Sequence, residues 1–169
     1  MNGQALVTGA GKRLGREIAL YLAGRGLDVA VHYNSSSDEA EEVAQSCRDK
    51  GVKSATLRAN LIDESEIQTL VPRAVDALGG PLTVLVNSAS IFEDDTIETA
   101  TRESWDRHLE SNLRAPFVLT QAFAAQVPAY CLVRLVGLVI SRVKIAIHTE
   151  TCKRFGACRR PQLIPCVVL

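Results

Sequence analysis

The sequence predicts an α/β fold in which helices cover both faces of a doubly wound parallel sheet. Two observations predict this fold class. Short, continuously apolar runs alternate with longer segments whose apolar residues recur at helical spacing, and a glycine-rich turn follows the first apolar run. Strands that are buried on both faces have continuous apolar sequences, and a strict strand–helix alternation makes the sheet parallel.

Four strands are predicted from the apolar runs, at residues 5–7, 29–31, 53–57 and 82–86. The first predicted helix contains Leu14, Ile18 and Leu22 on one face and ends at Gly24. We expect the second helix to begin with Ser37 as its N-cap and to run to Lys50.

A third helix is predicted from Glu64 to just before Gly79, and a longer helical region from residue 101 to 126, disturbed at Pro116. Residues 135–140 are a candidate fifth strand, and the pattern degrades beyond Pro128. The sheet is therefore expected to be truncated after about the fifth strand.

Charge and cysteine content divide the chain near residue 127. Residues 1–127 carry 12 basic and 18 acidic side chains, whereas residues 128–169 carry seven basic and one acidic, together with four of the five cysteines. We expect one domain over 1–127, with 128–169 as a divergent basic tail that completes or flanks it. The tail is either the product of a frameshift or a genuine alternative ending, and limited proteolysis is expected to cut first after Pro128.

Composition argues against several classes of protein. A formal net charge of zero gives no indication of nucleic-acid binding. The apolar stretch 131–147 is interrupted by Arg134, Arg142 and Lys144, so no transmembrane helix is expected. No signal peptide is recognised, so we expect a cytoplasmic protein without disulfides. The spacing of His148 and the late cysteines matches no structural zinc site, and no metal is expected.

The turn after the first predicted strand runs from Thr8 to Gly15 and reads T-G-A-G-K-R-L-G. Backbone N–H groups at a helix N-terminus bind phosphates, and glycines let the backbone approach them closely. Gly9 suits the tight turn and Gly15 suits close packing of the helix on the strand. A strand before the turn and a helix after it favour a nucleotide-binding site over a simple turn.

These residues resemble the short-chain dehydrogenase/reductase family, a Rossmann-type fold whose turn is T-G-x-x-x-G-x-G. Arg13 stands at the middle glycine of that pattern, and the segment 12–16 (K-R-L-G-R) is similar to the pteridine reductase branch. The segment after the second strand supports the same branch. The residues that the resemblance assigns to the cofactor in these two segments are Gly9, Arg13, Leu14, Gly15, His32, Tyr33, Asn34 and Ser35.

The expected cofactor is NADP rather than NAD. An acidic residue after the second strand would bind the ribose 2′-hydroxyl and repel a 2′-phosphate, but residues 29–37 contain no acid. Arg13 supplies a cation, while Ser35 and Ser36 supply hydroxyl donors. The pteridine reductase pattern commonly has an arginine where Ser35 stands, and this departure is expected to weaken phosphate binding.

The resemblance implies further contacts after the third and fourth strands. Asn60 and Leu61 would lie beside the adenine. The segment corresponding to N-N-A-G in the family would lie against the cofactor, and its members here are Asn87, Ser88, Ala89 and Ser90. Asn112 corresponds to a helical asparagine that holds a proton-relay water in the family, and Ser141 lies roughly where the family has its catalytic serine.

The family's Tyr-x-x-x-Lys pair is not found. The sequence has three tyrosines, Tyr21, Tyr33 and Tyr130, and none is followed four residues later by lysine. The resemblance therefore implies an NADP-dependent oxidoreductase acting on a small molecule, with pterins as the suggested substrate and impaired turnover. A homo-oligomer is compatible with this interpretation. The alternatives are a catalytically inactive nucleotide-binding protein, or a partner subunit that docks through an exposed sheet edge onto a full-length relative.

Overall fold

The computed structural model describes residues 3–127, 133–135 and 166–168. Ser141, Tyr130, the tail cysteines other than Cys166, and all of the candidate fifth strand except Leu135 lie outside these residues. The same is true of the expected proteolytic site after Pro128.

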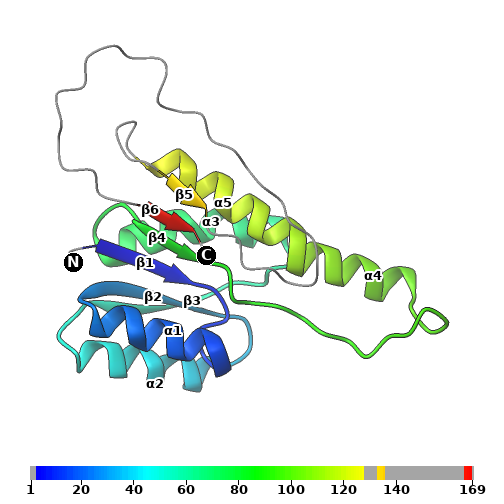
Figure 1. Cartoon of the computed structure of the whole chain (residues 1–169), viewed down its shortest axis with the longest axis horizontal. Coiled ribbons are helices and arrows are strands. Elements are labelled where there is room, and N and C mark those ends of the chain that lie inside the picture. Colours follow the sequence, from blue (N-terminus) through cyan, green and yellow to red (C-terminus); the bar gives the residue numbers. More distant parts are fainter. Residues whose placement is uncertain (1–2, 128–132, 136–165, 169) are drawn as a thin grey trace, which may run out of the picture.

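Strands and helices alternate along the described chain, as predicted (Figure 1). In chain order the elements are β1 (Gly3–Val7), α1 (Arg13–Gly24), β2 (Leu27–Tyr33), α2 (Ser37–Arg48), β3 (Ser54–Arg58), α3 (Glu64–Leu78), β4 (Val84–Val86), α4 (Arg102–Leu109), the π-helical turn η1 (Glu110–Arg114), α5 (Ala115–Gln126), β5 (Val133–Leu135) and β6 (Cys166–Val168).

The sheet has the order β3-β2-β1-β4-β6-β5, and every strand pair in it is parallel. From β1 the chain winds outward through β2 and β3, and then returns to place β4 on the other side of β1. The strand order therefore reverses between β1 and β4. In open α/β sheets, ligands bind outside the carboxyl ends of the strands at such a switch point.

Two apolar cores lie on opposite faces of the sheet because successive strand side chains point in opposite directions. Leu6, Ala30 and Leu85 face a core that they share with α3 and α5. Val7, Val31 and Val86 face a second core, built with α1 and α2. Figure 1 shows α1 and α2 on one side of the strands and α3 and α5 on the other. The predicted doubly wound α/β fold is thus confirmed.

Several predicted boundaries differ from the observed ones, and side-chain contacts accompany two of the differences. The N-cap of α2 is Ser36 and not Ser37; Ser37 is already helical, and its hydroxyl lies 3.5 Å from Tyr33 Oη. Strand β4 begins at Val84 rather than at residue 82, because the Leu82 N–H donates to Gln126 Oε1 instead of to a strand partner.

The long helical region predicted over 101–126 is interrupted before Pro116, at η1. Pro116 lies at the start of α5, directly after η1, so its missing N–H falls where the helical hydrogen-bond pattern changes. Strand β6 was not predicted at all. Within the described residues, no helix has both the length and the apolar character that spanning a membrane requires.

Candidate functional site

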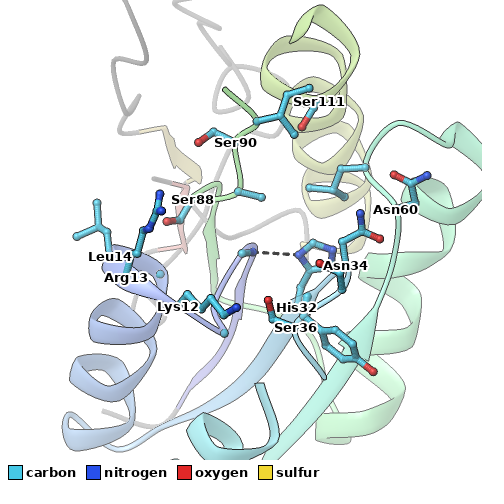
Figure 2. A pocket seen from close by; sticks show the side chains of 18 of the residues that line it. Lys12, Arg13, Leu14, His32, Asn34, Ser36, Asn60, Ser88, Ser90 and Ser111 are labelled. Carbon is cyan, nitrogen blue, oxygen red and sulfur yellow. Dashed lines mark hydrogen bonds between the residues drawn. The ribbon is translucent and has the colours of Figure 1, made fainter. Parts of the chain in front are cut away.

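A cleft of about 500 Å³ opens at the carboxyl ends of β1 to β4, at the switch point of the sheet (Figure 2). Four loops, one after each of these strands, supply most of its lining, and η1 contributes Ser111. The residues that line it are Gly9, Gly11, Lys12, Arg13, Leu14, Gly15, His32, Tyr33, Asn34, Ser35, Ser36, Asn60, Leu61, Ile62, Ser88, Ala89, Ser90, Ile91 and Ser111.

The glycine turn is shaped by close backbone contacts. A Cβ on Gly15 would lie 2.3 Å from the carbonyl oxygen of Gly9, and a Cβ on Gly9 would lie 2.8 Å from Ala89 Cα. Gly9 also has a φ of +63°. Side chains at these two positions would push α1 away from β1 and the turn away from the loop after β4, so the glycines keep the floor of the cleft narrow.

Arg13 occupies the position of the middle glycine and has a φ of +51°. The left-handed region is unfavourable for a residue with a branched or long side chain, and such strain concentrates at functional sites. In Figure 2 the Arg13 side chain points up along the cleft wall beside Leu14 and Ser88. The chain therefore accepts local strain at a place where a guanidinium group lines the cleft.

In the part of the chain that the structure describes, no side chain caps the backbone donors in the first turn of α1. Its N-cap, Lys12, makes no side-chain capping bond, and the first turn contains no acidic residue. Helix α3, by contrast, is capped by Asp63, which accepts from Ser65 N and Glu66 N. An acid-free, uncapped helix N-terminus that faces a cleft is a site for an anion such as a phosphate.

Thr8 joins the turn to the loop after β4. Its hydroxyl lies 3.3 Å from the carbonyl oxygen of Val86, to which it donates, and accepts from the N–H groups of Ser88 and Ala89 at 3.0 Å each. Thr8 is buried, so these bonds are shielded from water. The hydroxyl consequently fixes the distance between two of the four walls of the cleft.

His32 joins the turn to the loop after β3. Its Nδ1 accepts from Gly9 N at 3.0 Å, so Nε2 must carry the proton that it donates to the Ala59 carbonyl, also at 3.0 Å. Burial lowers the pKa of His32 to about 4, although the Ala59 hydrogen bond opposes the shift. A neutral imidazole with 1% of its surface exposed therefore holds the backbone of the turn in place.

Asn60 was expected to lie beside the adenine. Its Oδ1 already accepts from Ile62 N at 3.2 Å, which leaves one lone pair for a ligand. Its backbone N–H donates to Glu66 Oε2 at 2.8 Å. The loop after β3 is thus held in shape by its own contacts and by the start of α3.

Asn112 lies in η1 and clamps the loop after β4. Its Oδ1 accepts from Ile91 N and its Nδ2 donates to Ile91 O, both at 2.9 Å. The side-chain amide is thus engaged with backbone rather than directed at the cleft. π-Helical turns are frequent at functional sites, where they re-aim one residue of a helix.

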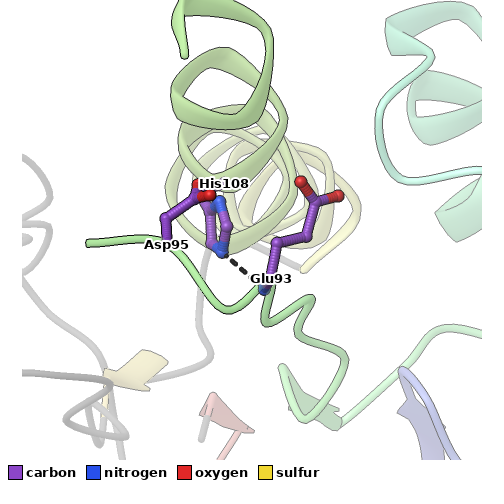
Figure 3. A group of neighbouring side chains, drawn as sticks. All are labelled: Glu93, Asp95 and His108. Carbon is purple, nitrogen blue, oxygen red and sulfur yellow. Dashed lines mark hydrogen bonds between the residues drawn. The ribbon is translucent and has the colours of Figure 1, made fainter. Parts of the chain in front are cut away.

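Glu93, Asp95 and His108 bring three metal-ligating groups together beside α4 (Figure 3). Both imidazole nitrogens are engaged, since Nε2 accepts from Glu93 N at 3.0 Å and Nδ1 lies 2.8 Å from the Ser104 carbonyl. Glu93 also forms an ion pair with Arg107 at 2.8 Å. The histidine therefore positions the loop after β4 against α4, and the cluster carries no argument for a metal.

The cleft brings together nearly all of the residues predicted to bind the cofactor. Asn87 is the exception; it does not line the cleft, and its buried Oδ1 has no hydrogen-bond partner among the described residues. Thr8, Lys12 and Ser111 were not among the predicted site residues. Thr8 and Lys12 belong to the turn motif and could have been found there, whereas nothing in the sequence distinguishes Ser111.

Residues 4–136 match the sequence model of the family described as short chain dehydrogenase. The 3-oxoacyl-[acyl-carrier-protein] reductase FabG of Staphylococcus epidermidis is 38% identical over 126 residues, covering 75% of this chain and 51% of that protein. A short-chain type dehydrogenase/reductase of Picea abies is 32% identical over 161 residues, covering 90% of this chain and 57% of that protein. The chain therefore spans about half the length of the curated relatives it matches.

Solved structures of reductases and dehydrogenases also match the chain. The FolM alternative dihydrofolate reductase 1 of Brucella suis, in complex with NADP, superposes with a TM-score of 0.71 at 33% identity, over 79% of this chain and 56% of that one. A short chain dehydrogenase of Burkholderia cenocepacia in complex with NADP superposes with a TM-score of 0.74 at 32% identity, over 85% of this chain and 59% of that one.

Proposed function

Because the chain belongs to the short-chain dehydrogenase family, we propose that its cleft binds NADP(H) and that it carries the cofactor-binding part of an NADP-dependent oxidoreductase. The bound cofactor would supply a hydride to a small-molecule substrate. The uncapped N-terminus of α1 would bind the phosphates, and the loops after β2 and β3 would hold the adenosine. The loop after β4 would lie along the rest of the dinucleotide.

The observation that carries the proposal is the turn from Thr8 to Gly15. Three features fit a dinucleotide there: the close contacts at Gly9 and Gly15, the absence of acids in the first turn of α1, and backbone donors that no described side chain caps. Relatives of the same fold whose structures contain NADP support the choice of ligand.

Preference for NADP over NAD rests on charge. Arg13 lines the cleft, and Ser35 and Ser36 line it after β2 where an acid would repel the 2′-phosphate. Titration of NADPH and NADH by cofactor fluorescence should show NADPH binding at least tenfold more tightly, since a charge-assisted phosphate contact contributes more than about 1.4 kcal/mol. The variant Arg13→Ala should remove most of that difference.

Arg16→Ala is the matched control, because Arg16 lies on α1 and does not line the cleft. It should keep the preference for NADPH. Equal affinities of the unaltered chain for the two cofactors would contradict the NADP proposal, and no binding of either would contradict the nucleotide-binding proposal.

A pterin is the substrate class that we propose for the oxidoreductase. The K-R-L-G-R segment at residues 12–16 resembles pteridine reductases. The structural neighbours of the chain include FolM alternative dihydrofolate reductases. We further propose that the 169-residue polypeptide binds cofactor with impaired turnover, because its sequence contains no Tyr-x-x-x-Lys pair. The catalytically inactive binder and the partner subunit of a full-length relative remain the alternative functions.

A further inference from the structure

Lys12 and Glu39 form an ion pair at the edge of the cleft. Lys12 is the N-cap of α1 and lines the cleft, while Glu39 lies in the first turn of α2. Their Nζ and Oε1 atoms are 2.7 Å apart. In Figure 2 the Lys12 side chain extends from the turn toward Ser36, at the start of α2. The pair therefore joins the glycine turn to the loop after β2.

The turn and the start of α2 are close enough for one ligand group to contact both. A Cβ on Gly11 would lie 3.4 Å from Ser36 Cβ and from Ala40 N. Lys12 and Ser36 therefore lie where the loop after β2 meets the turn, which is the region of a dinucleotide-binding fold that reads the ribose 2′-position.

Glu39 is an acidic residue that lies beyond residues 29–37, in the first turn of α2. The hydrogen bond from Lys12 holds the pKa of Glu39 below its ordinary value, so the carboxylate is ionised at neutral pH. Its charge offsets that of Lys12. The cleft consequently offers a 2′-phosphate less positive charge than its lining residues alone suggest.

We propose that Glu39 is a specificity-determining residue whose carboxylate competes with the 2′-phosphate of NADP for Lys12 and so reduces the preference of the chain for NADP over NAD. This inference rests on the proposed NADP-binding function. When the phosphate enters, Lys12 exchanges its internal carboxylate partner for the ligand, and the negative charge of Glu39 is left beside a phosphate dianion. Both effects oppose phosphate binding, and neither affects a ligand that has only a 2′-hydroxyl.

The test uses the full chain and two small probes, 2′,5′-ADP, which carries the 2′-phosphate, and 5′-AMP, which lacks it. Both are titrated by calorimetry, with NADP+ titrated in parallel. Glu39→Gln should bind 2′,5′-ADP roughly twofold to fivefold more tightly, because exposed ion pairs are weak, and should bind 5′-AMP unchanged. The gain should shrink as salt is raised, since both charges are partly exposed.

Glu42→Gln is the control, because it removes the same charge from α2 one turn further along the helix. It should leave the affinity for both probes at the level of the unaltered chain. An unchanged or weaker affinity of Glu39→Gln for 2′,5′-ADP, while the unaltered chain binds NADP+, would overturn the role of Glu39 alone. Failure of every variant and of the unaltered chain to bind NADP+ would overturn the proposed function, and this inference with it.

Discussion

Gly15 shows at the scale of one residue how the cleft depends on a missing side chain. Alanine at this position would place its Cβ 2.3 Å from the Gly9 carbonyl oxygen, and the nearest atoms all belong to the backbone of Gly9 and Ala10, so no flexible group can move aside. Gly15→Ala should therefore abolish nucleotide binding and destabilise the fold by about 1–3 kcal/mol, the usual effect of overpacking. Urea unfolding and cofactor titration would measure the two effects.

Gly24 offers a matched control on the same helix. Nothing lies within 4 Å of a Cβ built on it, and it is the last residue of α1. Gly24→Ala should leave binding unchanged and stability unchanged or slightly raised, because alanine has the higher helix propensity. Equal losses in the two variants would show that the contact at Gly15 does not govern the turn.

His32 makes the stability of the turn depend on pH. Its pKa is lowered from 6.5 to about 4, so the folded state favours the neutral ring. That stabilisation is fully present above pH 6.5 and is lost as the pH falls toward 4, where protonation of Nδ1 removes the acceptor for Gly9 N–H. The loss should approach about 3 kcal/mol.

His32→Gln removes this titration. Urea unfolding at pH 7 and pH 5 should show a lower free energy of unfolding for the variant at pH 7, but a smaller decrease between the two pH values than in the unaltered chain. The same decrease in both proteins would mean that other groups cause the pH dependence.

At the scale of elements, α1 and α3 differ at their N-termini. The N-terminus of α1 faces the cleft and Lys12 makes no side-chain capping bond, whereas Asp63 caps α3. The sequence predicted that both helices follow strands, and it placed the glycine turn before α1. It did not predict the short β4 or the π-helical turn, because both depend on long-range partners. The Gln126 side chain accepts a hydrogen bond from the Leu82 N–H, and the Asn112 side chain bonds to both the backbone N–H and the carbonyl of Ile91. Local propensity and periodicity contain no information about such partners.

The clamp between η1 and the loop after β4 gives an element-scale prediction. Asn112→Ala removes two part-buried hydrogen bonds to Ile91 and leaves that backbone N–H and C=O without their partners. We expect a loss of about 1–3 kcal/mol in stability and weaker cofactor binding. Hydrogen exchange should also become faster at Ile91.

Gln68→Ala is the corresponding control, because Gln68 is exposed on α3 and its side chain bonds only to Glu64 among the described residues. It should change stability by less than about 0.5 kcal/mol. Unchanged exchange at Ile91 in Asn112→Ala would contradict the clamp.

For the whole molecule, sequence patterns were sufficient to predict the doubly wound sheet and most of the residues that line the cleft. Continuous apolar strands and a glycine turn are encoded locally, and the carboxyl ends of parallel strands necessarily meet at one edge of the sheet. The ion pair of Lys12 with Glu39 and the backbone contacts of His32 could not be predicted, because they depend on how four loops approach one another in space.

Whether the chain consumes cofactor as well as binding it is also a property of the whole molecule. Purified chain with NADPH and an oxidised pterin should bind cofactor yet consume it far below the ordinary enzymatic range of about 1–10³ per second, since a positioned general acid contributes about 10²–10⁴-fold. Absorbance of the cofactor would follow the reaction. Turnover within that range would show that another group donates the proton, and Tyr130→Phe would be the first variant to examine.

The π-helical turn also sets the rotational phase between α4 and α5. Trp105, Leu109, Leu113 and Phe117 are all more than a third exposed and follow one another at intervals of four residues. Along an uninterrupted α-helix this spacing would rotate by roughly 40° at each step, because a turn takes 3.6 residues. The wider turn at η1 absorbs most of that drift between Leu109 and Phe117. Deleting one residue of η1 would turn α5 by roughly 100° about its axis, which would move Phe123 out of the core that it shares with Leu85 of β4.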